Sequence, residues 1–170
     1  MFIDIILIVL VLVAVIFDIR ERRIPNQVII IGLILAFLNH LLQGDYTGLI
    51  LSLKGLALGL GLLLFPYFLG GFGAGDVKLL GMVGALKGCT FVFNTFLWMA
   101  VIGGIIAIII LMRRHLLKET VTRIVRGLFL SRLGAANFFD SVNKEELSIY
   151  YPYGVAIGLG VVASYFKGWW

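Results

Sequence analysis

Two aspartates, Asp18 and Asp76, are the residues of this sequence best suited to chemistry. Asp18 closes the first apolar run, and Asp76 opens the fourth, directly after the glycine-rich stretch 70–75. Ionisable groups at or within membrane spans are costly, so they are functional candidates by default. Two carboxylates on one side of a membrane suit hydrolysis, because an ionised one takes a proton from water while a protonated one donates to the carbonyl oxygen. Held close together, they share one proton and titrate as a coupled pair.

The surroundings of the two aspartates leave a plainer interpretation open. An aspartate at a helix N-terminus interacts favourably with the macrodipole, so Asp18 and Asp76 can also be read as unrelated helix-end residues. However, four of the six residues in 70–75 are glycines, among them Gly73 and Gly75. Glycines allow positive φ angles and the close approach of another backbone, which a simple turn between helices does not require. We expect this loop to give a peptide access to Asp76.

The remaining acidic residues have simpler explanations. Glu21 lies among three arginines, which predicts a local surface ion pair. The others fall toward the outer side or in the long polar segment, where water solvates a charge readily. These six are Asp4, Asp45, Glu119, Asp140, Glu145 and Glu146.

Other catalytic chemistries have little support in the sequence. His40 and His115 are assigned to opposite sides of the membrane, and with a single cysteine there is no Cys-x-x-Cys, so no zinc site is expected. Ser52 lacks the Gly-x-Ser-x-Gly surroundings of a serine nucleophile. Cys89 is better explained as a packing residue. No metal and no cofactor are therefore expected.

The composition places these residues in a membrane protein. Of 170 residues, 61% are hydrophobic and 14% charged, which is too apolar for a small soluble domain. We expect one integral membrane domain, 1–170, of the all-α class, because runs of this length lack the alternation of a barrel. About six spans are predicted from the apolar runs 2–17, 28–42, 49–69, 77–86, 89–112 and 153–166. The fourth run is short, so either it continues past Gly88 or Asp76 lies within the membrane thickness.

The positive charges predict the orientation. The polar breaks 18–27, 70–78 and 113–150 hold three, one and seven of the fourteen lysines and arginines, so these breaks are expected to face the cytoplasm. Both chain ends are then expected outside a cell (inner) membrane. The net charge of +5 fits loops that face anionic lipid, and no nucleic-acid partner is expected.

Two further patterns concern helix packing and the membrane surface. Glycine pairs in small-xxx-small spacing, such as Gly55 with Gly59, predict close contacts between helices. Within 113–150, one helical face carries Leu117, Val121, Ile124 and Leu128, and the opposite face carries Glu119, Arg123 and Arg126. This pattern predicts an amphipathic helix on the cytoplasmic surface.

Asp18 followed by Arg-Ile-Pro-Asn at 23–26, together with Gly-Ala-Gly-Asp-Val-Lys-Leu-Leu at 73–80, resembles the type IV prepilin peptidase family. These are membrane aspartic proteases of the GxGD type, and the resemblance implies that Asp18 and Asp76 are the catalytic pair. Gly73 and Gly75 match the motif glycines. Four more residues of these motifs are candidate supporting residues: Lys78, Arg23, Pro25 and Asn26. For Lys78, contact with a carboxylate or substrate and simple snorkelling are both open.

The resemblance also implies the substrate. Family members remove the short basic leader of type IV prepilins or prepilin-like proteins at the cytoplasmic face, in pilus assembly and protein secretion. Larger members carry a cysteine-containing insert between the first two spans and are associated with N-methylation. Here only 19–27 fills that place, so the chain resembles the short TadV/CpaA-like form, and no methylation is expected. Archaeal preflagellin peptidases are similar in size and remain an alternative. The oligomeric state is left open.

Two other functions compete with a peptidase. A small proton- or cation-coupled transporter would use Asp18 and Asp76 as ion-binding residues, since intramembrane carboxylates also mark ion pathways. Transporters commonly show paired broken helices, and only one glycine-rich interruption is visible here. A scaffold without chemistry would leave the resemblance of the first motif unexplained.

Overall fold

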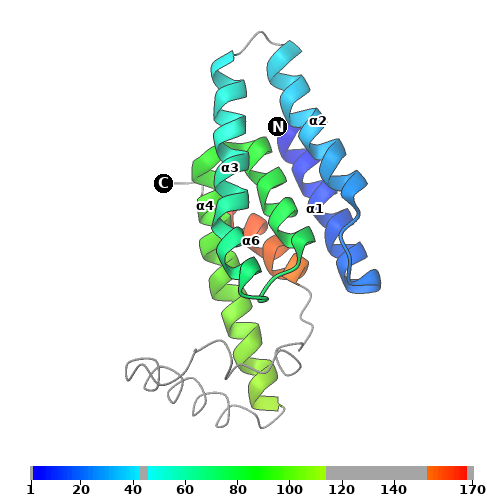
Figure 1. Ribbon diagram of the computed structural model, residues 1–170, viewed down its shortest axis with the longest axis vertical. Coiled ribbons are helices and arrows are strands. Elements are labelled where there is room, and N and C mark those ends of the chain that lie inside the picture. The colour runs from blue at the N-terminus through cyan, green and yellow to red at the C-terminus, as the bar shows by residue number, and fades with distance from the viewer. Residues whose placement is uncertain (1, 43–45, 114–152, 168–170) are drawn as a thin grey trace. The chain divides into compact units, whose positions relative to one another are not determined.

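The computed structural model describes residues 2–42, 46–113 and 153–167, and in these ranges every regular element is a helix. The helices are α1 (Phe2–Glu21), α2 (Asn26–Leu42), α3 (Tyr46–Phe68), α4 (Ala74–Arg113) and α6 (Tyr153–Lys167), shown in Figure 1. The predicted all-α class is confirmed for the described residues. The amphipathic helix expected around Leu117 lies outside them.

The chain forms two compact units, residues 1–102 with 152–170 and residues 103–151. The first unit contains α1, α2, α3, most of α4 and α6. In the second unit, the described part is the end of α4, from Gly103 to Arg113. Both candidate aspartates belong to the first unit.

Helix α4 is two helices joined by a sharp break at Gly88. Gly88 has φ 81° and ψ −178°, which is far from helical and suits a residue without a Cβ. Figure 1 shows the chain reversing its direction at this point. The fourth apolar run therefore does not continue past Gly88, and the stretch 74–87 rises only about 20 Å at 1.5 Å per residue. The remaining alternative, Asp76 within the membrane thickness, stays a prediction.

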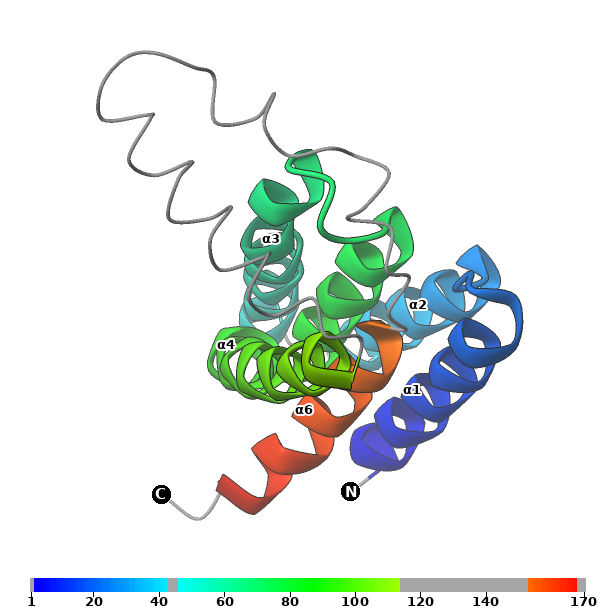
Figure 2. The same ribbon diagram turned by 90° about the horizontal axis from the view of Figure 1, so that it is seen from below.

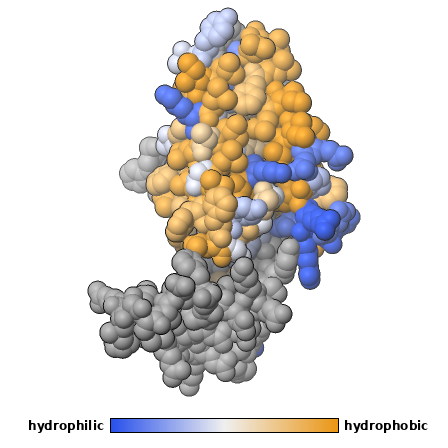
Figure 3. All heavy atoms as spheres, in the orientation of Figure 1, coloured by the Kyte–Doolittle hydropathy of each residue, from blue (hydrophilic) through white to orange (hydrophobic). Residues whose placement is uncertain are grey.

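The outer surface of the helices is apolar. Helix α3 and the stretch Ala74–Ile110 are long and apolar enough to cross a membrane, and Asn26–Leu42 and Tyr153–Phe166 are shorter apolar helices. Large apolar side chains are exposed along several helices, as the space-filling view shows (Figure 3). Hydrophilic side chains in that view gather where α1 runs into α2. This distribution is typical of a membrane protein, whereas the count of six spans stays a prediction.

Glycines bring α3 and the first half of α4 into backbone contact. A Cβ built on Gly59 would lie 2.5 Å from the carbonyl oxygen of Leu80 and 2.9 Å from the Cα of Gly81. Gly55 and Gly84 face each other even more closely, so neither has room for a side chain. The predicted close packing of the small-residue pair Gly55 and Gly59 is confirmed.

Helix α1 packs against α2 and α6 along one buried stripe. Leu7, Val11 and Ala14 are almost completely buried, and Asp18 continues their face one turn further along. Residues at this spacing share one side of an α-helix, so the apolar packing of α1 also determines where Asp18 points. The aspartate is thereby turned toward the interior of the bundle.

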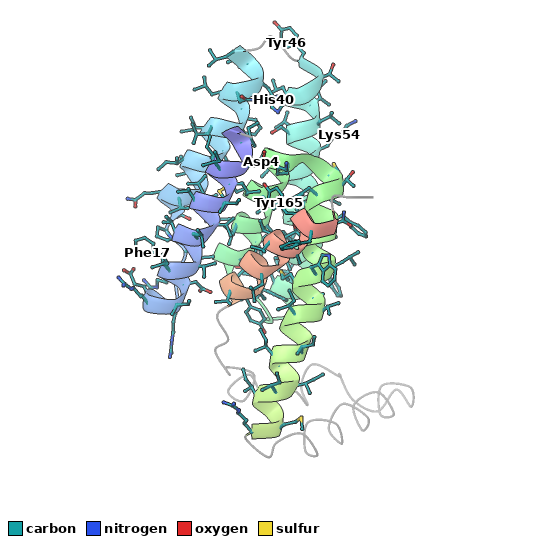
Figure 4. The ribbon with its side chains drawn as sticks, turned by 180° about the vertical axis from the view of Figure 1, so that it is seen from behind. Asp4, Phe17, His40, Tyr46, Lys54 and Tyr165 are labelled. Carbon is teal, nitrogen blue, oxygen red and sulfur yellow. The ribbon has the colours of Figure 1, made fainter. Side chains whose placement is uncertain are left out.

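A polar cluster connects the start of α1, the end of α6 and the break in α4 at Gly88. The Lys87 ammonium lies 2.7 Å from Asp4 Oδ1, and the Tyr165 hydroxyl donates a hydrogen bond of 3.0 Å to the same oxygen. Lys87 Nζ also lies 5.3 Å from the centre of the Phe91 ring. Figure 4 shows Asp4 beside Tyr165, with Phe17 at the far end of α1. The expectation that Asp4 is simply solvated is wrong, because Lys87 is brought to it by the turn at Gly88.

Candidate active site

Asp18 lies in the last turn of α1. The helix ends because Arg22 adopts a left-handed conformation, φ 54°, while its N–H donates to the Asp18 carbonyl oxygen at 3.0 Å. The Asp18 side chain is buried, with 8% of its residue surface exposed. Its Oδ2 accepts a hydrogen bond of 2.8 Å from the backbone N–H of Gly154, at the start of α6. Helix α6 therefore satisfies a carboxylate that would otherwise be buried without a donor.

Asp76 lies in the first turn of α4 and closes its own capping interaction. The N–H of Gly73 donates to Asp76 Oδ2 at 3.0 Å, and the N–H of Asp76 donates to the Gly73 carbonyl at 3.1 Å. This reciprocal pair resembles a capping box, in which the third helical residue reaches back to the residue before the helix. Asp76 is 7% exposed. Gly73 itself is exposed, and a Cβ there would lie 3.2 Å from Asp76 Oδ2.

Three segments far apart in the sequence meet around these carboxylates. They are the end of α1, the glycine loop before α4, and the start of α6. The rings of Phe72 and Tyr153 stack with their centres 4.3 Å apart, directly beside the Gly154 bond to Asp18. Gly154, which bonds Asp18, is thus the neighbour of Tyr153, whose ring contacts Phe72 four residues before Asp76. Figure 2 views the molecule from the end at which these segments meet.

The two sequence motifs also contact each other directly. A Cβ on Gly75 would lie 3.2 Å from the Cβ of Ile24, so the glycine lets the loop pack against the turn after α1. Lys78 Nζ donates a 3.1 Å hydrogen bond to Asn26 Oδ1 on the exposed surface. This bond ties α4 to α2 and gives Lys78 a partner that neither sequence interpretation included.

The other two motif residues lie at the turn into α2. Arg23 is exposed, and the carbonyl of Pro25 accepts the N–H of Val28 at 3.2 Å, in the first turn of α2. Pro25 therefore starts a helix, as its position predicted. The roles of Arg23 and Pro25 as supporting residues of the two aspartates stay predictions.

The alternative chemistries find no site in the described part of the chain. No group of three His, Cys, Asp or Glu residues in these ranges is arranged to hold a metal ion. Ser52 is buried and donates a 2.6 Å hydrogen bond to the Ala85 carbonyl, where α3 crosses α4. That serine is a packing residue between helices.

Comparison with known families decides the membership. The model of the type IV leader peptidase family matches residues 5–108, a range that contains both buried aspartates and the glycine loop. The chain belongs to the type IV leader peptidase family. No curated protein and no solved structure matches it in the corresponding searches. Membership in the leader peptidase family implies a peptidase, and it confirms the resemblance that the two motifs carry.

Sequence reasoning missed the part that α6 contributes to the site. Neither Tyr153 nor Gly154 was a predicted site residue, whereas Gly154 bonds Asp18 and Tyr153 contacts Phe72 in the glycine loop. The family match ends at residue 108, so it does not include them either. A Tyr-Gly step at the start of an apolar helix carries no local signal that it faces an aspartate 136 positions away.

Proposed function

We propose that the protein is a membrane-embedded aspartic endopeptidase that removes the short basic leader of type IV prepilin or prepilin-like proteins. One observation carries the proposal. Two buried aspartates from separate motifs lie on segments that the start of α6 joins, since Gly154 bonds Asp18 and the neighbouring Tyr153 ring contacts Phe72, four residues before Asp76. Membership in the leader peptidase family supplies the class of substrate.

The chemistry follows from the pairing. Two like charges held close cannot both ionise comfortably, so Asp18 and Asp76 share one proton. The ionised carboxylate removes a proton from a water molecule, and that water attacks the carbonyl carbon of the scissile peptide bond. The protonated carboxylate donates its proton to the carbonyl oxygen, which stabilises the tetrahedral intermediate. The proton held by the base then passes to the leaving amine as the C–N bond breaks, and a hydroxyl proton of the collapsing intermediate returns to the other carboxylate, so the pair again holds one proton.

The glycine loop supports access of an extended peptide. Gly70 has φ 81°, a conformation that side chains rarely adopt, and nothing lies within 4 Å of where its Cβ would be. Gly70 and Gly73 are exposed, whereas Asp76 is buried three residues further on. A substrate backbone approaching this loop meets no side chains at the exposed glycines and comes within three residues of Asp76.

The charges near the site support cleavage at the cytoplasmic face. Arg20, Arg22 and Arg23 are exposed at the end of α1 that carries Asp18. Positively charged residues beside membrane spans favour the cytoplasmic side. Cleavage there matches a leader that remains in the cytoplasm while the hydrophobic helix of the pilin lies in the membrane.

A cleavage assay in liposomes tests this proposal. Purified wild-type protein and a prepilin with a basic leader should yield mature pilin, whereas Asp18→Asn and Asp76→Asn should each remain folded and stop cleavage. Glu21→Gln is the matched control, because it removes an exposed carboxylate from the same helix, three residues beyond Asp18. A metal chelator should have no effect. If either Asn variant cuts at a near-normal rate, the two aspartates are not a catalytic pair and the transporter interpretation is favoured.

A further inference from the structure

Two adjacent residues at the start of α6 contact Asp18 itself and the glycine loop that precedes Asp76. Gly154 donates its backbone N–H to Asp18 Oδ2 at 2.8 Å. The Tyr153 ring packs against the ring of Phe72, which lies in the loop just before α4, four residues ahead of Asp76. The spacing between the two carboxylates is thus bridged by a helix that lies outside the range of the family match.

The bond from Gly154 requires a residue without a side chain. A Cβ at this position would lie 2.6 Å from Asp18 Oδ2 and 3.0 Å from both the Cβ and the Cγ of Asp18. Ordinary carbon–carbon contacts are about 3.5–4.0 Å, so a methyl group would push the carboxylate aside by about 1 Å. Asp18 has little freedom to absorb this shift, because its helix is fixed by the buried stripe of Leu7, Val11 and Ala14.

Tyr153 acts on the other aspartate through its ring. The centre of the Tyr153 ring lies 4.3 Å from that of Phe72 with the planes 42° apart, a close tilted contact. Phe72 immediately precedes Gly73, whose N–H and carbonyl both bond Asp76. A loop with glycines at 70, 71 and 73 has few side chains to fix its path, so the ring contact of Phe72 helps to hold it in place.

We propose that Tyr153 and Gly154 are positioning residues that set the relative placement of the Asp18 and Asp76 carboxylates. The inference rests on the proposed function, since it assigns how that dyad is held together. Gly154 fixes the Asp18 carboxylate through the N–H bond, and Tyr153 fixes the loop that carries Asp76. Neither residue supplies or removes a proton in the reaction.

The expected signature is a loss in kcat with little change in KM. A misplacement of about 1 Å in a catalytic group can slow a reaction about 10²-fold. The substrate is held mainly by its leader and hydrophobic helix, so its binding should be unaffected. Gly154→Ala should therefore lower kcat by about 10- to 100-fold and change KM by less than about threefold.

Steady-state cleavage of a prepilin by the full chain in liposomes tests the inference with five variants. Tyr153→Ala should also lower kcat about tenfold or more, whereas Tyr153→Phe keeps the ring and should restore nearly the wild-type value. Leu159→Ala, on the exposed side of α6, is the matched control for a truncation in this helix and should keep kcat. Asp18→Asn reports on the dyad itself. The thermal midpoint of each variant is measured in parallel.

The outcomes separate this inference from the proposed function. If the wild type fails to cleave, or Asp18→Asn cleaves normally, the dyad is wrong and the inference falls with it. If those two behave as proposed but Gly154→Ala keeps a wild-type kcat, only the positioning role is refuted. The positioning role is also refuted if Tyr153→Phe loses as much kcat as Tyr153→Ala. Loss of rate that follows loss of folded protein in both Gly154→Ala and Tyr153→Ala overturns it as well.

Discussion

The contact between α3 and α4 gives a stability prediction with a built-in control. Gly59 and Gly61 lie two residues apart in α3 but face different surroundings. A Cβ on Gly59 would lie 2.5 Å from the Leu80 carbonyl oxygen, whereas nothing lies within 4 Å of a Cβ on Gly61. Alanine at position 59 must therefore push the two helices apart by about 1 Å to reach an ordinary contact distance of about 3.5 Å. Alanine at position 61 requires no movement.

The expected energies have opposite signs. Overpacking of this kind costs about 1–3 kcal/mol. Separation of the helices adds to that cost, because a gap of about 0.5–1 Å removes a quarter to a half of the van der Waals attraction between two contacting atoms. Replacing the helical Gly61 instead removes the entropic cost of glycine, about 0.5–1 kcal/mol. The free energies of unfolding of Gly59→Ala and Gly61→Ala should thus differ by about 2–4 kcal/mol.

Thermal unfolding of the purified variants in one detergent measures this difference. For a chain of this size, 1 kcal/mol corresponds to about 2–4 °C in the midpoint, so Gly59→Ala should melt about 2–10 °C below the wild type. Gly61→Ala should melt at or slightly above it. Equal midpoints for the two variants would refute the backbone contact, and a lower midpoint for Gly61→Ala than for Gly59→Ala would refute the placement of α3 against α4.

Three further predictions concern the rest of the chain. Asp4→Asn and Lys87→Met should show a coupling of about 1–2 kcal/mol in a double-mutant cycle of unfolding. The coupling is moderate because water still reaches both side chains, which are 29% and 26% exposed. Additive effects would mean that the pair does not form. Mature pilin produced by this enzyme alone should have an unmodified amino terminus in mass spectrometry, because the cysteine-containing insert is absent, and a methylated product would contradict this. Spin labels should report Leu117 and Leu128 deeper in the bilayer than Arg126, whereas equal water accessibility would identify a solvated segment.

Local patterns predicted much of this architecture. The apolar runs gave the helices, and Pro25 gave the start of α2. The glycine-rich stretch before Asp76 is a loop that leads into a helix, as its composition indicated. These features depend on residues close in the sequence, whose spacing and backbone preferences can be read directly.

Long-range pairings could not be predicted in the same way. Lys87 reaches Asp4 across 83 positions, and Gly154 reaches Asp18 across 136. Both contacts depend on how the helices pack in three dimensions. A local sequence pattern does not show which two helix ends lie next to each other. The short fourth run shows the same limit, since its reversal depends on the conformation of one glycine, Gly88.

In the proposed mechanism, Asp18 and Asp76 act as one unit on one water molecule. Residues that act as a unit show strongly non-additive losses, because removing either one already disables the chemistry. The most direct test compares prepilin cleavage by Asp18→Asn, Asp76→Asn and the double variant, all shown to be folded. Each single variant should lose about 10³-fold or more in kcat/KM, and the double variant should be at most about threefold slower than either. A double variant that loses the product of the two single effects, about 10⁶-fold, would show that the two carboxylates act independently and would contradict the dyad.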